Sequence, residues 1–108
     1  MILYGIKTCD TCRKALKALA AAGHKVRFHD VRAVPLGPDD RSRLIEALGD
    51  AIVNRASATW RGLPPEARTG TTDALIAAHP TLMKRPVIDT GRAIHLGWGA
   101  DVQAALLQ

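Results

Sequence analysis

The chain has 108 residues, of which 47% are hydrophobic and 23% charged, and its formal net charge is +5. This length and composition suit one globular, soluble domain with a single core. The basic residues are scattered and aromatic residues make up only 4% of the chain, so a direct nucleic-acid interface is not indicated.

The chain shows no pattern of export or membrane insertion. Its start lacks a basic segment followed by a long apolar stretch, and no apolar run approaches membrane-spanning length. We therefore expect a cytoplasmic protein with no signal peptide and no membrane contact. In a reducing cytosol, a C-x-x-C pair of cysteines is more often catalytic than structural.

The first predicted elements are a short buried strand and a helix, joined by a loop that carries both cysteines. The strand is the apolar run that opens the chain. Cys9 and Cys12 follow with C-x-x-C spacing, and an amphipathic helical pattern then runs to Gly23, which marks its end. Asp10 or Thr11 is the expected N-cap of this helix.

That placement gives Cys9 a physical reason to be reactive. A thiolate at a helix N-terminus faces unpaired N–H groups and the positive end of the helix dipole, and both lower the thiol pKa. Lys7 either lowers this pKa further or is simply solvated. Cys12 lies about one turn into the helix and could attack a mixed disulfide on Cys9, which would release a Cys9–Cys12 bridge. Asp10 is expected as a helix cap rather than as a general acid.

Three other interpretations of the cysteines stay open. Both could be small buried residues without a chemical role. A zinc site would need more ligands, but there is no second cysteine pair and the four histidines are not at finger spacing, so no metal site is predicted. A structural disulfide is less expected without a secretory context.

Residues 25–32 are rich in β-branched and aromatic side chains and alternate imperfectly, which favours a second strand. A strand, a helix and a second strand form a βαβ unit, so these two strands should be parallel. A helical insert then covers about residues 38–80. Its first helix should be capped by Asp39 or Asp40 and should end at Gly49, and another should run over residues 64–79, with a possible break at its Thr-Gly-Thr-Thr run.

The last part of the chain predicts a β-hairpin and a helix. Val87-Ile88 is the first strand, Thr90-Gly91 the turn, and residues 92–96 the second strand. Pro86 stands at the start of the first strand, where it cannot donate to the ladder, and it could be cis. A helix over residues 101–107 completes the order β-α-β, helical segment, β-β-α, which is an α/β chain.

Five motifs in this order narrow the family: YGIKTCDTCRKA, FHDVR, NRASATWRGL, LMKRPVI and LGWGAD. Together they resemble the arsenate-reductase-like (ArsC/Spx) family, and most closely its small bacterial subgroup of uncharacterised ArsC-family reductases. The resemblance covers nearly the whole chain. It implies a single domain over residues 1–108 with a thioredoxin-like fold, in which a four-stranded mixed sheet is interrupted by the helical insert.

The resemblance also implies roles for particular residues. Cys9 matches the family's nucleophile, and Cys12 matches the second cysteine of the Spx-like branch. Arsenate reductases of the family hold their oxyanion with three arginines, and Arg55 and Arg85 would correspond to the first two. Pro86 matches the family's proline, which is cis and packs beside the cysteine loop.

The third arginine has no counterpart here. The region beyond the hairpin is Leu96-Gly97-Trp98-Gly99, and Arg92 lies earlier, inside the hairpin. Gly5-Ile6-Lys7 also stands where arsenate reductases have His-Asn. An arginine binds an oxyanion bidentately, so losing one removes two donors and a charge. Arsenate reduction is therefore less expected than a thiol-disulfide reaction.

We therefore predict a monomeric, thiol-dependent oxidoreductase that reduces disulfides with glutathione. Cys9 and Cys12 would be catalytic, Arg85, Arg55 and Lys7 would bind a small thiol or anionic substrate, and Pro86 and Asp10 would be structural residues near the site. Glutathione would be a co-substrate and no cofactor would be bound, since the chain has neither G-x-x-x-x-G-K-[ST] nor G-x-G-x-x-G. The alternatives are a redox-responsive regulator that binds RNA polymerase, as in the Spx-like branch, or an arsenate reductase.

Overall fold

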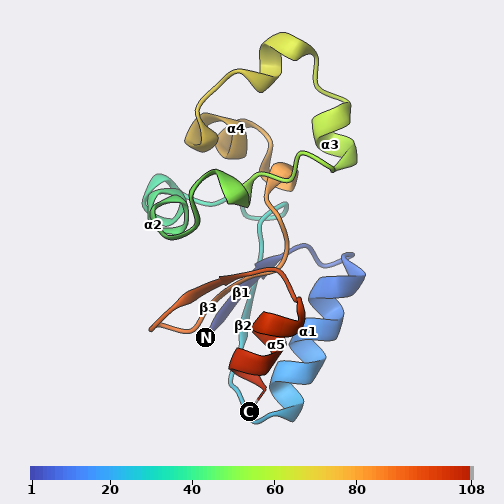
Figure 1. Ribbon diagram of the computed structural model, residues 1–108, viewed down its shortest axis with the longest axis vertical. Helices are drawn as coiled ribbons and strands as arrows, with labels where there is room; N and C mark the ends of the chain where they lie inside the picture. Colours follow the sequence, from blue (N-terminus) through green and yellow to red (C-terminus); the bar gives the residue numbers. More distant parts are fainter. Residues whose placement is uncertain (108) are drawn as a thin grey trace. The chain divides into compact units, whose positions relative to one another are not determined.

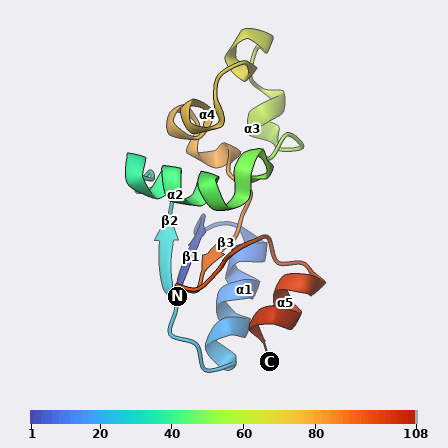
Figure 2. The ribbon, with the colours of Figure 1, turned by 60° about the vertical axis from the view of Figure 1, so that its left-hand side comes forward.

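A computed structural model describes residues 1–107, which divide into two compact units (Figures 1 and 2). The first unit contains residues 1–31 and the chain from Arg85 onward, and the second contains Arg32–Lys84. The helical insert of the prediction falls in the second unit. Whether the whole chain acts as a single domain stays a prediction.

The first unit is built on a four-stranded sheet with the strand order β2-β1-β3-β4. Its strands are β1 (Ile2–Gly5), β2 (Arg27–Asp30), β3 (Val87–Asp89) and β4 (Ile94–Leu96). β1 pairs in parallel with β2 and antiparallel with β3, and β3 and β4 form the antiparallel hairpin. The predicted thioredoxin-like arrangement with a mixed sheet is therefore confirmed.

Two helices, α1 (Asp10–Ala21) and α5 (Ala100–Leu106), lie side by side on one face of this sheet (Figures 1 and 2). Side chains alternate along a strand, so Leu3 of β1 and its cross-strand partner Ile88 of β3 face the helices together. They form a buried core with one stripe of each helix, which consists of Cys12, Ala15, Leu19, Val102 and Leu106. Cys12 is thus part of the hydrophobic core as well as of the cysteine motif.

The predicted end of α1 at Gly23 is confirmed. Gly23 has a φ of +92°, a conformation that glycine adopts without a steric penalty. Its N–H donates to the Ala20 carbonyl at 3.0 Å, and the N–H of His24 donates to the Leu19 carbonyl at 3.1 Å. This pair of bonds is a Schellman motif, which satisfies carbonyls that the helix end would otherwise leave exposed.

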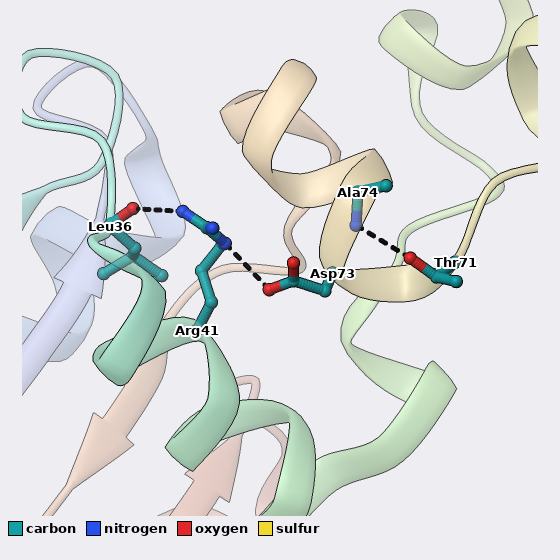
Figure 3. A network of polar contacts seen from close by, with 5 residues as sticks. All are labelled: Leu36, Arg41, Thr71, Asp73 and Ala74. Carbon is teal, nitrogen blue, oxygen red and sulfur yellow. Dashed lines mark hydrogen bonds and ion pairs between the residues drawn. The ribbon is translucent and has the colours of Figure 1, made fainter.

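The second unit is helical, with α2 (Pro38–Leu48), α3 (Ala58–Arg61), α4 (Thr72–Ala78) and short 3-10 helices at Gly49–Ile52, Pro65–Arg68 and Pro80–Leu82. Its buried side chains are Leu36, Leu44, Ile52, Val53, Leu75, Ile76, Leu82 and Met83. Arg41 of α2 links the first part of this unit to α4: its guanidinium donates to the Leu36 carbonyl at 2.8 Å and to Asp73 at 2.9 Å (Figure 3).

One prediction about this insert is corrected and another is confirmed. α2 begins at Pro38 with Gly37 as its N-cap, so Asp39 and Asp40 lie in the first turn, where their charge suits the helix dipole without capping it. The break predicted as possible at the Thr-Gly-Thr-Thr run of residues 64–79 is present, with a 3-10 helix before it and α4 after it. The Thr71 hydroxyl causes the restart, because it accepts the N–H of Ala74 at 3.1 Å and so caps α4 (Figure 3).

Within residues 1–107, no helix is long and apolar enough to cross a membrane.

Candidate active site

The site is built where β1 passes into α1. The N–H of Cys9 donates to the Ile6 carbonyl at 3.0 Å, which closes a tight turn after the strand. Cys9 itself has an extended backbone, and its carbonyl accepts the first hydrogen bond of α1 from Arg13 at 3.0 Å. Cys9 is therefore the N-cap residue, and its sulfur stands at the positive end of the helix dipole.

The prediction that Asp10 or Thr11 caps α1 is wrong. The helix begins at Asp10, and no side chain makes the capping bond, because the backbone of Cys9 already has the cap conformation. The exposed Asp10 carboxylate instead pairs with Arg13, whose hydrogen bond and charge hold the pKa of Asp10 below its usual range. Asp10 is thus a surface residue in the first turn of the helix.

The loop before Cys9 is fastened to the end of β2. The N–H of Lys7 donates to the carboxylate of Asp30 at 2.9 Å, and the N–H of Val31 donates to the Gly5 carbonyl at 2.9 Å. The side chain of Lys7 is exposed, and its influence on Cys9 stays a prediction. Sequence reasoning missed Asp30, since only the parallel pairing of β1 with β2 brings this carboxylate to the loop.

The sulfur of Cys9 is partly buried and surrounded by donors. Burial alone would raise its pKa, because it disfavours the charged form. The backbone N–H and the thiol of Cys12, followed by the guanidinium of Arg85, oppose burial by donating hydrogen bonds to this sulfur, and Arg85 also adds its charge. The donors outweigh burial, so the pKa of the Cys9 thiol lies below its ordinary value.

Cys12 has the opposite character. It is 0% exposed, and burial, aided by the neighbouring Cys9, raises the pKa of the Cys12 thiol to about 11. The N–H of Ile6, which donates to the Cys12 sulfur, and the charge of Arg85 only partly offset this effect. Cys12 therefore keeps its proton at neutral pH and acts as a hydrogen-bond donor to Cys9.

Arg85 and Pro86 enter the site from the start of β3. The peptide bond between them is cis, as the resemblance implied, and Pro86 is buried. The Pro86 carbonyl accepts the N–H of Gly97 at 2.8 Å, which extends the hairpin ladder beyond Val87. The structure thus brings three of the predicted site residues together, namely Cys9, Cys12 and Arg85.

Arg55 belongs to the second unit, where its guanidinium lies over the Trp60 ring, 5.3 Å from the ring centroid. Arg68 lies over the same ring at 5.5 Å. Such contacts between guanidinium groups and an indole are favourable cation–π pairs. The predicted role of Arg55 in anion binding stays a prediction.

In the part of the chain that the structure describes, no group of three or more histidine, cysteine, aspartate or glutamate side chains could hold a metal ion.

A comparison with known families agrees with this geometry. The model of the ArsC family matches residues 4–106. The chain belongs to the ArsC family. An uncharacterized protein of Haemophilus influenzae is 38% identical to it over 98 residues, which are 85% of this chain and 86% of that protein.

Solved structures of related proteins have the same fold as this ArsC-family chain. The YffB protein is 33% identical, with a TM-score of 0.89, and the match covers 99% of this chain and 98% of that one. An arsenate reductase (ArsC) related protein from Brucella melitensis is 29% identical, with a TM-score of 0.75, over 99% of this chain and 93% of that one. The family resemblance read from the sequence is confirmed, and at the level of the family it supports a thiol-based reductase.

Proposed function

We propose that this ArsC-family protein is a thiol-disulfide oxidoreductase that uses Cys9 as its nucleophile and glutathione as its reducing co-substrate. One observation carries the proposal: the Cys9 sulfur stands at the N-terminus of α1 and accepts hydrogen bonds from Cys12 and Arg85. A thiolate is the reactive form of cysteine, and this arrangement favours it.

The reaction would proceed through mixed disulfides. The Cys9 thiolate attacks one sulfur of a substrate disulfide, an S–S bond to Cys9 forms, and the other substrate sulfur leaves as a thiolate. A glutathione thiolate then attacks the Cys9 sulfur and displaces the bound half of the substrate. A second glutathione attacks the glutathione sulfur on Cys9, which forms glutathione disulfide and restores the Cys9 thiolate. Two electrons pass from two glutathione molecules to one substrate disulfide.

Arg85 would act twice in this cycle. It stabilises the Cys9 thiolate before the first attack and again when this sulfur is the leaving group of the last step. Glutathione carries two carboxylates, and the net charge of +5 suits an anionic co-substrate. The charge alone does not select glutathione, so turnover with glutathione is the test of this choice.

Resolution by glutathione is favoured over resolution by Cys12. An attack by Cys12 requires its thiolate, and with a pKa of about 11 only about one ten-thousandth of the thiol is ionised at neutral pH. Burial, the largest cause of the raised pKa, persists when Cys9 is in a mixed disulfide. An external thiol does not face this obstacle.

The test is turnover of a small disulfide with glutathione, followed by the consumption of NADPH through glutathione reductase. Cys9→Ser should abolish turnover, and the matched variant Cys12→Ser should keep most of it. Wild-type protein that turns over no disulfide, or a Cys9→Ser variant that is as active as wild type, would refute the proposal. Arsenate in the same assay should be a poor substrate, since no arginine follows the hairpin at residues 96–99.

The alternative of a redox-responsive regulator predicts a different outcome. Inactive wild-type protein that retains RNA polymerase in a pull-down, and does so only in one redox state of Cys9 and Cys12, would favour the regulator over the reductase.

A further inference from the structure

Gly5, the last residue of β1, lies directly against the buried cysteine. A Cβ atom added to Gly5 would stand 2.5 Å from the Cys12 sulfur and 3.2 Å from the Cys12 Cβ. Real Cβ atoms essentially never approach another atom closer than 3.0 Å. Gly5 is not among the glycines with a positive φ, so its backbone conformation does not explain the glycine. The glycine is explained by the Cys12 sulfur, which occupies the space that a side chain at Gly5 would need.

The sulfur of Cys12 is held in this place from several sides. Cys12 is 0% exposed and packs in the core with Leu3, Ala15 and Leu19. The N–H of Ile6, the residue after Gly5, donates to this sulfur. The core around Cys12 is close-packed, so it has no free space for a displaced sulfur. A methyl group at Gly5 would therefore force the Cys12 side chain and its neighbours to move.

We propose that Gly5 is a positioning residue for the Cys9 nucleophile: its missing side chain seats the Cys12 thiol where that thiol donates a hydrogen bond to the Cys9 sulfur. This inference deepens the proposed function and rests on it. Gly5 touches neither substrate nor the reacting sulfur and acts only through Cys12. Gly5, the last residue of β1, therefore helps to support the Cys9 thiolate.

The proposal predicts how the Gly5→Ala variant behaves. The new methyl group would force the Cys12 sulfur out of its seat, and the Cys9 thiolate would lose this donor. The thiol is a weak donor, but a hydrogen bond to a charged group is stronger than one between neutral groups. We expect alkylation of Cys9 at pH values below its pKa to slow by about tenfold, with a matching upward shift of the pH profile.

A double-mutant cycle separates this role from general damage to the fold. The rate of Cys9 alkylation by iodoacetamide is measured against pH in wild type, Gly5→Ala, Cys12→Ala and the double variant. Each single substitution should slow alkylation by a similar factor. The double variant should match Cys12→Ala, because the donor that Gly5 positions is already gone.

Gly37→Ala serves as the matched control, since a Cβ at Gly37 meets nothing within 4 Å and its φ of −71° suits any residue. It should leave the profile unchanged. An unchanged profile in Gly5→Ala would overturn the proposal. So would a double variant that reacts more slowly than Cys12→Ala, a comparison that works even where Gly5→Ala alone does not fold.

The alkylation profiles need no turnover, so they are independent of the test of the proposed function. Wild-type protein that reduces no disulfide would remove the proposed function and leave the Gly5–Cys12 comparison intact. If the enzyme is active but the effects of Gly5→Ala and Cys12→Ala on the alkylation rate add in the double variant, only the proposed role of Gly5 is refuted.

Discussion

Replacement of Arg85 by methionine should raise the pKa of the Cys9 thiol by about one unit. Arg85 donates a hydrogen bond to the Cys9 sulfur and also supplies a positive charge. A hydrogen bond to a charged group contributes about 1.5–3 kcal/mol, and about 1.4 kcal/mol corresponds to one pKa unit. Because Cys9 is only partly buried, solvent screens the interaction and the lower end of this range applies.

The assay is the pH dependence of iodoacetamide alkylation, with the modified residue identified by peptide mass. Below its pKa, the thiolate fraction of Cys9 should fall about tenfold in Arg85→Met. Arg85→Lys keeps the charge but loses the planar donor fork of arginine. In this variant the pKa of Cys9 should therefore lie between its values in wild type and in Arg85→Met. Arg92→Met removes the same charge from an exposed turn of the hairpin and should leave the profile unchanged.

Two results would refute this reasoning. An Arg85→Met variant with the wild-type profile would mean that Arg85 does not stabilise the thiolate. Equal shifts in Arg85→Met and Arg92→Met would mean that the net charge of the protein, rather than the contact with Cys9, sets the reactivity.

Three further predictions concern stability, each measured by urea unfolding. The pKa of Cys12 is about 11 in the folded protein and about 8.5 in the unfolded chain. The protonated thiol therefore contributes its full stability below about pH 8.5, and this contribution is lost as the pH rises to about 11. Wild type should lose more stability over this range than Cys12→Ala, and equal losses would contradict the raised pKa. Gly23→Ala should cost about 1–2 kcal/mol because of its φ of +92°, and a cost near zero would show that the strain is absent. Thr71→Ala should cost about 1 kcal/mol through loss of the cap of α4, and Thr71→Ser, which keeps the hydroxyl, should recover most of it.

The parts of the fold that sequence reasoning predicted are those with strong local patterns. The end of α1 at Gly23 and the βαβ unit follow from periodicity and from one glycine. The N-cap of α1 was predicted wrongly because the rule looks for a polar side chain, whereas the backbone of Cys9 fills this position without one. The possible break over residues 64–79 was correctly placed at the Thr-Gly-Thr-Thr run, because a threonine there is a good N-cap, and Thr71 is the residue that caps α4.

The candidate site could be predicted from the sequence only in part, for a different reason. The spacing of Cys9 and Cys12 can be read along the chain, but the approach of Arg85 depends on the pairing of β3 with β1, and only the family resemblance pointed to it. Neither Asp30 nor Gly5 belongs to a sequence pattern that would mark it as a site residue. A carboxylate that accepts a backbone N–H and a glycine that leaves room for a sulfur become visible only when tertiary neighbours are known.

The two cysteines illustrate why a C-x-x-C motif does not by itself define a dithiol enzyme. They have the same chemistry in the unfolded chain, and the fold separates them: Cys9 is surrounded by donors at a helix N-terminus, and Cys12 is enclosed in the core. Environments that push two pKa values apart assign one group to the charged role and the other to the neutral role. Here the neutral thiol lowers the pKa of the charged one by donating to it, so ionisation of Cys12 would remove the donor and place a second charge beside Cys9. The pair therefore favours a single thiolate, and that thiolate is on Cys9.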